Sequence, residues 1–343
     1  MGHDGGRGGD EPPARRAGVA DRDPTASDAA VPGGEGRRAR ALALAGLGAL
    51  VAQQASVVAV MWSSGRFDDP GAYTVYFSTQ AVYFLPYAIL AIPLATSAFP
   101  RLAERASAGD RAGFAGLLAL TTRGLLTVTA AGVAALVAAS VAVESAFDTF
   151  ADGSVDGMSE AIAWMAPGLV GFALIFHLSR ALYSLDHGRA AVVATSAGWI
   201  VVGVVAVVLP MLVVPDDRGA AVPGVVDDAV RDPLLSSLGA ANALGMTVAA
   251  VFLLLAVRRH GGPGAVAGVG RTTPVLLVGS ALGAVAGYAL TAALIPDGPS
   301  LLVAILVGLA GAVVAVLVVV GTSLALDRTA LLAVLRPSAV ADA

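Results

Sequence analysis

The chain of 343 residues contains no cysteine, which excludes disulfide bonds, thiolate metal sites and cysteine nucleophiles. It also lacks a Walker loop and the HExxH and GxSxG motifs, so nothing in the sequence indicates an enzyme. The histidines lie too far apart in sequence to indicate a metal cluster: His3, His177, His187 and His260. We therefore expect no catalytic residue, no metal, no cofactor and no nucleic-acid partner.

Charged side chains are scarce as well. Only 13% of the residues are charged, whereas 57% are hydrophobic and the mean hydropathy is +0.79. A soluble globular domain carries about 25% charged residues, so the composition excludes that class. Lysine is absent, and all 21 basic residues are arginines.

Eight long apolar stretches follow residue 40. A stretch of about 20 apolar residues matches the hydrocarbon thickness of a bilayer. Backbone that crosses this layer must satisfy its own hydrogen bonds, so each stretch indicates a helix. We expect an all-α polytopic membrane protein with about eight transmembrane helices. Their expected spans are 41–62, 73–98, 113–143, 159–183, 190–213, 235–257, 273–295 and 300–325.

The two ends of the chain differ from this apolar region. Residues 1–39 are rich in Gly, Pro, Asp and Arg and contain no apolar run, which predicts a disordered cytoplasmic tail. Because they also lack the features of a signal peptide, the first apolar segment is expected to stay as an uncleaved anchor. We expect a helical bundle over 40–326 and a short cytoplasmic tail over 327–343. The third span is too long for one crossing, and 113–122 is expected to lie at the interface.

Most of the later arginines fall in alternate gaps between the expected spans. One set of gaps contains Arg37, Arg38, Arg40, Arg101, Arg105, Arg111, Arg189, Arg258, Arg259, Arg271, Arg328 and Arg336. The opposite set contains only Arg66, Arg218 and Arg231 and is instead rich in Asp and Glu. The positive-inside rule assigns the arginine-rich gaps to the cytoplasm. Both termini are then expected to be cytoplasmic.

Polar and aromatic residues form a stripe along the second expected helix. Tyr73, Tyr76, Gln80, Tyr83 and Tyr87 recur at spacings of three and four, which places them on one helical face. The first two tyrosines fit an interfacial aromatic belt. The three deeper residues lie where a belt is no explanation. They indicate either a polar cavity and interhelical hydrogen bonds or plain packing.

Two prolines interrupt the same helix. Pro86 and Pro93 each remove a backbone donor and crowd the preceding turn, so we expect a bend. A bent helix can act as a hinge in a gate, but many bent membrane helices are static. The sequence leaves both interpretations open.

Other polar groups fall inside expected spans. Gln53 and Gln54 lie near the middle of the first helix, and adjacent residues point about 100° apart, so at least one faces other helices. Asn242 raises the same question in the sixth. Interhelical hydrogen bonding and the lining of a polar path are the two interpretations.

His177 and Arg180 lie three residues apart near the arginine-rich end of the fourth span. Arg180 either snorkels to the lipid headgroups or turns inward to bind an anionic headgroup, such as a pyrophosphate, in a bidentate fashion. His177 is either a hydrogen-bonded histidine of the bundle or a proton relay. Glycines of the last two spans suit close helix packing: Gly279, Gly283, Gly287, Gly308 and Gly311.

Short motifs resemble the MurJ/MviN family of lipid II flippases, within the multidrug/oligosaccharidyl-lipid/polysaccharide exporter superfamily. They are YFLP at 83–86, AIPLAT at 91–96, FPRL at 99–102, APGLVG at 166–171, and SRALYS at 179–184 followed by Asp186. The likeness to the family covers about 40–325. Members have two six-helix lobes and a terminal helix pair, so the eight helices here resemble the second lobe plus that pair. Gln80 and Ala81 stand where some members have Asp-Arg, and Ala190 and Ala191 replace a common Thr-Pro.

The resemblance implies a lipid II flippase of cell-wall biogenesis in the bacterial inner membrane, in a truncated or split form. Its expected partners are membrane lipids, a polyprenyl-pyrophosphate-linked saccharide, and a missing N-terminal lobe or partner subunit. Two alternatives are open: a flippase for another polyprenyl-linked saccharide, and a non-transporting scaffold for cell-wall enzymes. The candidate substrate-binding residues are Gln53, Gln80, Tyr83, Tyr87, His177 and Arg180, and the candidate hinge residues are Pro86 and Pro93.

Overall fold

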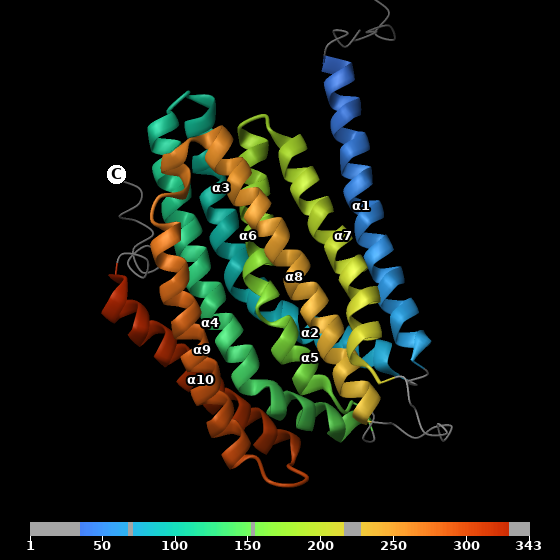
Figure 1. Cartoon of the computed structure of the whole chain (residues 1–343). Coiled ribbons are helices and arrows are strands. Elements are labelled where there is room, and N and C mark those ends of the chain that lie inside the picture. The colour runs from blue at the N-terminus through green and yellow to red at the C-terminus, as the bar shows by residue number, and fades with distance from the viewer. Residues whose placement is uncertain (1–34, 68–70, 152–154, 216–227, 329–343) are drawn as a thin grey trace, which may run out of the picture. The chain divides into compact units, whose positions relative to one another are not determined.

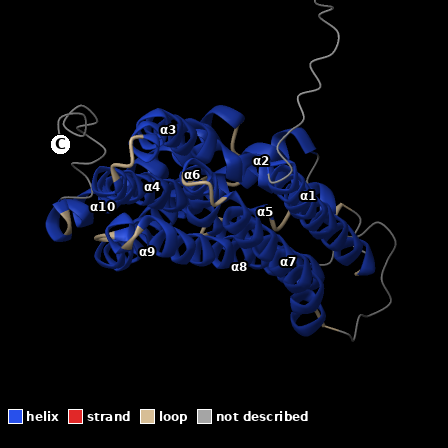
Figure 2. Ribbon diagram, turned by 90° about the horizontal axis from the view of Figure 1, so that it is seen from above, coloured by secondary structure: helices blue, strands red, loops and turns tan. Residues whose placement is uncertain are grey.

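The computed structural model describes residues 35–67, 71–151, 155–215 and 228–328. Most of the expected N-terminal tail, the end of the expected C-terminal tail and most of the acidic connector after residue 215 lie outside these residues. The chain divides into two units, and the second, Ala41–Ala343, contains the features considered below. Its described residues are helical and contain no strand (Figures 1 and 2), as expected for an all-α protein.

The helices follow one another with short connections in the described residues. They are α1 (Glu35–Arg66), α2 (Ala72–Pro86), the π-helix η1 (Tyr87–Ala91), α3 (Ile92–Ser107), α4 (Arg111–Ala151), α5 (Met158–Met165), α6 (Gly168–Ser184), α7 (Gly188–Val213), α8 (Asp228–Gly261), the 3₁₀ turn η2 (Pro263–Val266), α9 (Val269–Leu294) and α10 (Leu301–Leu326).

The expected spans are confirmed by the lengths and composition of these helices. Seven continuous helical stretches are long and apolar enough to cross a membrane, and α5 and α6 form an eighth candidate that is bent by 47°. The bend lies at Pro167, which lacks a backbone donor and crowds the preceding turn. This bend was not among the features expected from the sequence.

The α5–α6 pair runs along much of α4. At its start, the Ser159 amide donates a hydrogen bond to Glu144 Oε2 near the end of α4, at 2.6 Å. At its finish, Ser184 lines the same pocket as Arg111, the first residue of α4. The pair therefore passes from one end of the bundle to the other and counts as one crossing.

Helix α4 is longer than a bilayer requires. Its 41 residues form one uninterrupted helix, about 60 Å long at 1.5 Å per residue, against a hydrocarbon core of about 30 Å. Residues 113–122, expected at the interface, belong to this same helix. The extra length lets α4 contact α5, α6, α9 and α10.

The proline pair flanks the π-helix η1. Pro86 ends α2, and Pro93 is the second residue of α3, within the continuous stretch Ala72–Ser107. The hydrogen-bond ladder widens between them, as expected where a proline cannot donate. Pro86 also packs closely on α4, because a Cβ atom on Gly132 would lie 3.0 Å from Pro86 Cβ.

Helix α8 packs against its neighbours through glycines. A Cβ atom on Gly239 would lie 2.8 Å from the carbonyl oxygen of Ala161 on α5. One on Gly245 would lie 2.6 Å from the carbonyl oxygen of Gly198 on α7. Such distances leave no room for a side chain, so the backbones of α5, α7 and α8 approach closely.

The expected close packing of the last two helices is confirmed. Gly283 of α9 faces α10 so closely that a Cβ atom would lie 2.6 Å from the Ala315 carbonyl oxygen. Gly308 of α10 faces α4, where a Cβ atom would lie 3.0 Å from Ala142 Cβ. Figure 2 shows α4, α9 and α10 grouped together at one side of the bundle.

A polar cluster joins the same three helices near the arginine-rich end. Arg123 of α4 donates through Nε to Thr272 Oγ1 at 3.1 Å and pairs through its guanidinium with Asp327 at 3.3 Å. The Thr272 hydroxyl in turn donates to Asp327 Oδ2 at 2.6 Å. Asp327 is only 4% exposed, and this cluster provides for its charge.

Replacing Gly171 of α6 by alanine tests the glycine-mediated packing. The new Cβ atom would clash with the backbone of Met246 on α8, which cannot move aside like a side chain. We expect Gly171→Ala to lower the free energy of unfolding by about 1–3 kcal/mol, despite the higher helix propensity of alanine. The measurement is denaturant unfolding of the purified protein in detergent micelles.

The matched control is Gly116→Ala in α4, where no atom lies within 4 Å of the added Cβ. Alanine there is expected to leave stability unchanged or to raise it by up to about 1 kcal/mol. Equal effects of the two substitutions would contradict the packing described here.

Candidate functional site

A cavity of about 130 Å³ lies between α1, α2, α6, α7 and α8. Its polar and aromatic lining comprises Gln53, Ser56, Tyr73, Tyr76, Phe77, Gln80, Phe84, Phe172, Trp199 and Asn242. Such a volume has room for several water molecules, and the amide groups supply donors and acceptors for them. A polar chamber has therefore formed among helices that are otherwise apolar.

The two adjacent glutamines of α1 have different environments. Gln53 lines the cavity, whereas Gln54 is exposed on another side of the helix. At least one of them was expected to face other helices, and Gln53 is that residue. It lies across the cavity from Gln80 of α2 and Asn242 of α8.

Tyr83 is buried beside the cavity. Its side chain is 1% exposed, and its hydroxyl interacts with the side chain of Asn242. Even so, neither Tyr83 Oη nor Asn242 Nδ2 has a hydrogen-bond partner of good geometry among the described residues. Tyr76, considered above for an interfacial belt, is also buried and lines the cavity.

Aromatic side chains continue the site from the cavity along α6. Tyr87 of η1 packs edge-on against Phe172 and Phe176, with ring centroids at 4.9 and 5.8 Å. The ring centroids of Phe84 on α2 and Phe172 are 5.0 Å apart. These contacts join the stripe predicted on α2 to a second stripe on α6.

Arg180 ends the stripe on α6. Phe172, Phe176 and Arg180 are four residues apart, so they share one helical face. The Arg180 guanidinium carbon lies 3.7 Å from the centroid of the Phe176 ring and 5.9 Å from that of Phe99. Within the described residues Arg180 forms no ion pair. Because the plane of its guanidinium group stacks on the Phe176 ring, the N–H groups at the edge stay available to other partners.

His177 belongs to another face of α6. It is 2% exposed, and its Nε2 atom is hydrogen-bonded to Thr121 Oγ1 of α4 at 3.1 Å. It does not line the cavity. The geometry matches a histidine whose polar atom is satisfied by the bundle.

The structure thus brings Gln53, Gln80 and Tyr83 together around Asn242 and connects them through Tyr87 to Arg180. Several contributors were not among the candidate site residues, including Phe84, Phe172, Phe176, Trp199 and Asn242. The spacing of Phe172, Phe176 and Arg180 is the signal that could have identified the second stripe.

Comparisons with known proteins agree with this architecture. The family model described as lipid II flippase MurJ matches residues 32–306. A solved structure of lipid II flippase MurJ, in an inward closed conformation, aligns with a TM-score of 0.52 at 14% sequence identity. The alignment covers 82% of this chain and 53% of the solved one, so the chain spans about half the length of that protein. A search of curated proteins gives no significant match.

The unsatisfied hydroxyl of Tyr83 leads to a prediction about stability. Because removing a buried polar atom that lacks a good partner relieves a desolvation cost, we expect Tyr83→Phe to be neutral or stabilising by up to about 1 kcal/mol. Thr121→Val, which removes the partner of His177, is expected to destabilise by about 1–2 kcal/mol. Thermal unfolding in detergent measures both changes.

Tyr288→Phe serves as the control, because Tyr288 is exposed on α9 and should tolerate the loss of its hydroxyl. A loss of more than about 1 kcal/mol in Tyr83→Phe would show that its hydroxyl is hydrogen-bonded after all.

Proposed function

The chain belongs to the MurJ family of lipid II flippases, and we propose that it takes part in moving a polyprenyl-pyrophosphate-linked saccharide across the bacterial inner membrane for cell-wall biogenesis. The observation that carries this proposal is the polar cavity of Gln53, Gln80 and Asn242, joined by an aromatic face to Arg180. A route for a headgroup must offer polar contacts at a depth where lipid tails offer none.

Each part of the site suits one part of such a headgroup. Amide side chains can exchange hydrogen bonds with sugar hydroxyls, since they carry both donors and acceptors. The planar guanidinium of Arg180 matches two phosphate oxygens at once, and its stacking on Phe176 fixes its orientation. The polyprenyl tail would stay in the bilayer.

The proposal treats this chain as one lobe plus a terminal helix pair. The chain spans about half of the MurJ structure that it resembles, and this partial coverage supports a further lobe supplied by another polypeptide or segment. The arginine-rich connections α3–α4, α6–α7 and α8–η2 meet around one pocket at one end of the bundle. We assign this end, and both termini, to the cytoplasm by the positive-inside rule.

Alternating access then needs a flexible element next to the cavity. We propose that η1, between Pro86 and Pro93, is this hinge, because a π-helix lacks the regular hydrogen-bond ladder that stiffens an α-helix. Tyr87 begins η1 and contacts α6, so a change at the hinge would alter the aromatic face.

Binding of lipid II by the purified full chain tests the proposal. Removing the Gln53 amide should weaken binding by about fivefold in Gln53→Ala, the effect of one net hydrogen bond. The readout is the fluorescence of Trp199, which lines the cavity, in a background with Trp62→Phe and Trp164→Phe.

Gln54→Ala is the matched control, because Gln54 is the same residue type, one position further on, and exposed. It should bind lipid II like the parent protein. Unchanged binding in Gln53→Ala, or no binding by the parent protein, would rule out this cavity as the headgroup site and favour a scaffold. Tighter binding of another polyprenyl-linked saccharide would change the substrate and keep the site.

A second test concerns Arg180. Arg180→Lys keeps the charge but loses the planar fork and most of the stacking on Phe176. We expect about tenfold weaker binding of lipid II, with little change for an undecaprenol-linked analogue without phosphates. The affinity ratio between the two ligands is measured in the same fluorescence assay. An equal loss of affinity for both ligands would mean that Arg180 supports the aromatic stripe and does not bind the phosphates.

A further inference from the structure

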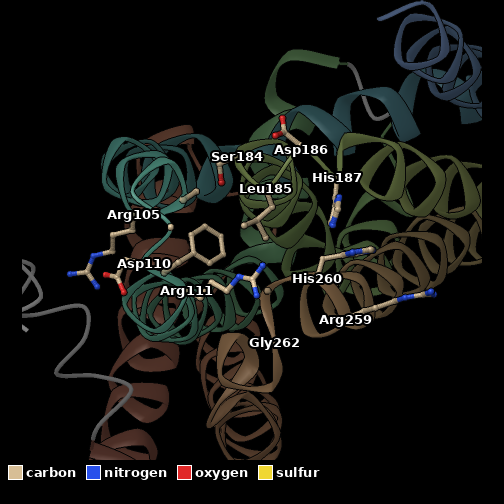
Figure 3. Close-up of a pocket in the computed structure, with 14 residues that line it drawn as sticks. Arg105, Asp110, Arg111, Ser184, Leu185, Asp186, His187, Arg259, His260 and Gly262 are labelled. Carbon is tan, nitrogen blue, oxygen red and sulfur yellow. The ribbon is translucent and has the colours of Figure 1, made fainter. Parts of the chain in front are cut away.

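A second pocket, separate from the polar cavity, lies at the arginine-rich end of the bundle. It has a volume of about 650 Å³ and is formed by the α3–α4 connection, the α6–α7 connection and the end of α8. Figure 3 shows its lining, with Arg111 at the start of α4, His187 before α7 and His260 at the end of α8. None of these residues belongs to the polar cavity or to the aromatic stripe that ends at Arg180.

The groups that face this pocket are mainly cationic or proton-donating. The side chain of Arg111 reaches across the pocket toward His260 (Figure 3). The rings of His187 and His260 lie with their centroids 3.8 Å apart, so their nitrogen atoms are concentrated in one place. Arg259 adds a further positive charge to the rim.

Two carboxylates line the pocket against three arginines, Arg105, Arg111 and Arg259, so they offset only part of the positive charge. Asp110 accepts a hydrogen bond from the Gly113 amide at 2.9 Å and so caps the start of α4. Its neighbour Arg105 donates to the Gly113 carbonyl oxygen at 2.7 Å. In Figure 3 the carboxylate of Asp186 points away from Arg111 and His260. A net positive site is left for an anion.

An apolar groove of about 750 Å³ continues from this pocket, and four residues line both: Asp186, His187, Arg259 and His260. It runs between α7 and α8, where Val193, Phe252 and Leu255 line it and are all substantially exposed. A free phosphate would use only the cationic part. A phosphate attached to an acyl chain would use both parts, because the chain covers the apolar groove.

We propose that this pocket and groove bind one anionic phospholipid, with its phosphate between Arg111 and His260 and an acyl chain between α7 and α8. The site lies at headgroup level, where arginines attract anionic lipids electrostatically. The contact is independent of the proposed transport and asks nothing of the polar cavity. Its place at the junction of three connections would hold the ends of α4, α7 and α8 together.

Native mass spectrometry of the full chain in detergent tests this proposal. Phosphatidylglycerol and phosphatidylcholine with the same acyl chains are titrated, and we expect the first to bind at least fivefold more tightly. Arg111→Gln and His260→Gln should each weaken the binding of phosphatidylglycerol by about fivefold. Arg271→Gln, which removes a charge from the exposed start of α9 outside the pocket, is the matched control and should have no effect.

Two further arms identify the source of the phosphate. Leu255→Asn adds a polar group to the apolar groove and should weaken the binding of phosphatidylglycerol, while the binding of inorganic phosphate should stay the same. Millimolar inorganic phosphate should not displace the lipid. Displacement by phosphate, no effect of Leu255→Asn, equal binding of both lipids, or an equal loss in Arg271→Gln would each overturn the proposal. Lipid II binding in the fluorescence assay reports the cavity separately.

Discussion

The close approach of helix backbones around α8 is the constraint on which the rest of this structure depends. Inside a bilayer, lipid tails are as apolar as leucine, so helices associate through close packing and not through burial from water. Gly239 and Gly245 of α8 bring α5 and α7 into backbone contact. Asn242 lies between these two glycines in sequence and points into the cavity. The glycine contacts therefore set the position of the one polar side chain that α8 gives to the site.

Polar groups in this bundle fall into two classes that sequence alone does not separate. His177 and Arg123 are partnered across helix interfaces, by Thr121 and by Thr272 with Asp327. Such groups contribute to the association of helices. Tyr83 and Asn242 meet without a full hydrogen bond, next to a chamber with room for water. Leaving such atoms unsatisfied costs free energy, and structures tolerate this cost mainly at functional sites.

The features that depend on length, hydropathy and one-helix periodicity could be predicted from the sequence. The eight spans and the stripe on α2 are of this kind, since each needs only the local pattern of residues. Which of Gln53 and Gln54 faces the cavity could not be predicted, because the rotation of α1 is set by its neighbours. The same holds for His177, whose partner Thr121 lies 56 residues away. The bend at Pro167 was not predicted, but it could have been, since a proline inside an apolar span is a strong local signal.

The distance between the polar cavity and Arg180 limits how a headgroup could bind to both. Phe172 lines the cavity and Arg180 is two turns further along α6, which separates them by about 12 Å along the axis. Arg180 is itself one turn from Ser184, which lines the basic end pocket, so the proposed orientation would place its guanidinium at headgroup level. A phosphate at Arg180 would thus stay near its position in the membrane surface while its saccharide reaches the amides of the cavity. In the proposed function, the aromatic rings between them would offer the sugar a surface without competing charges. In the proposed function, the headgroup would extend along the aromatic face before any phosphate has to leave the interface.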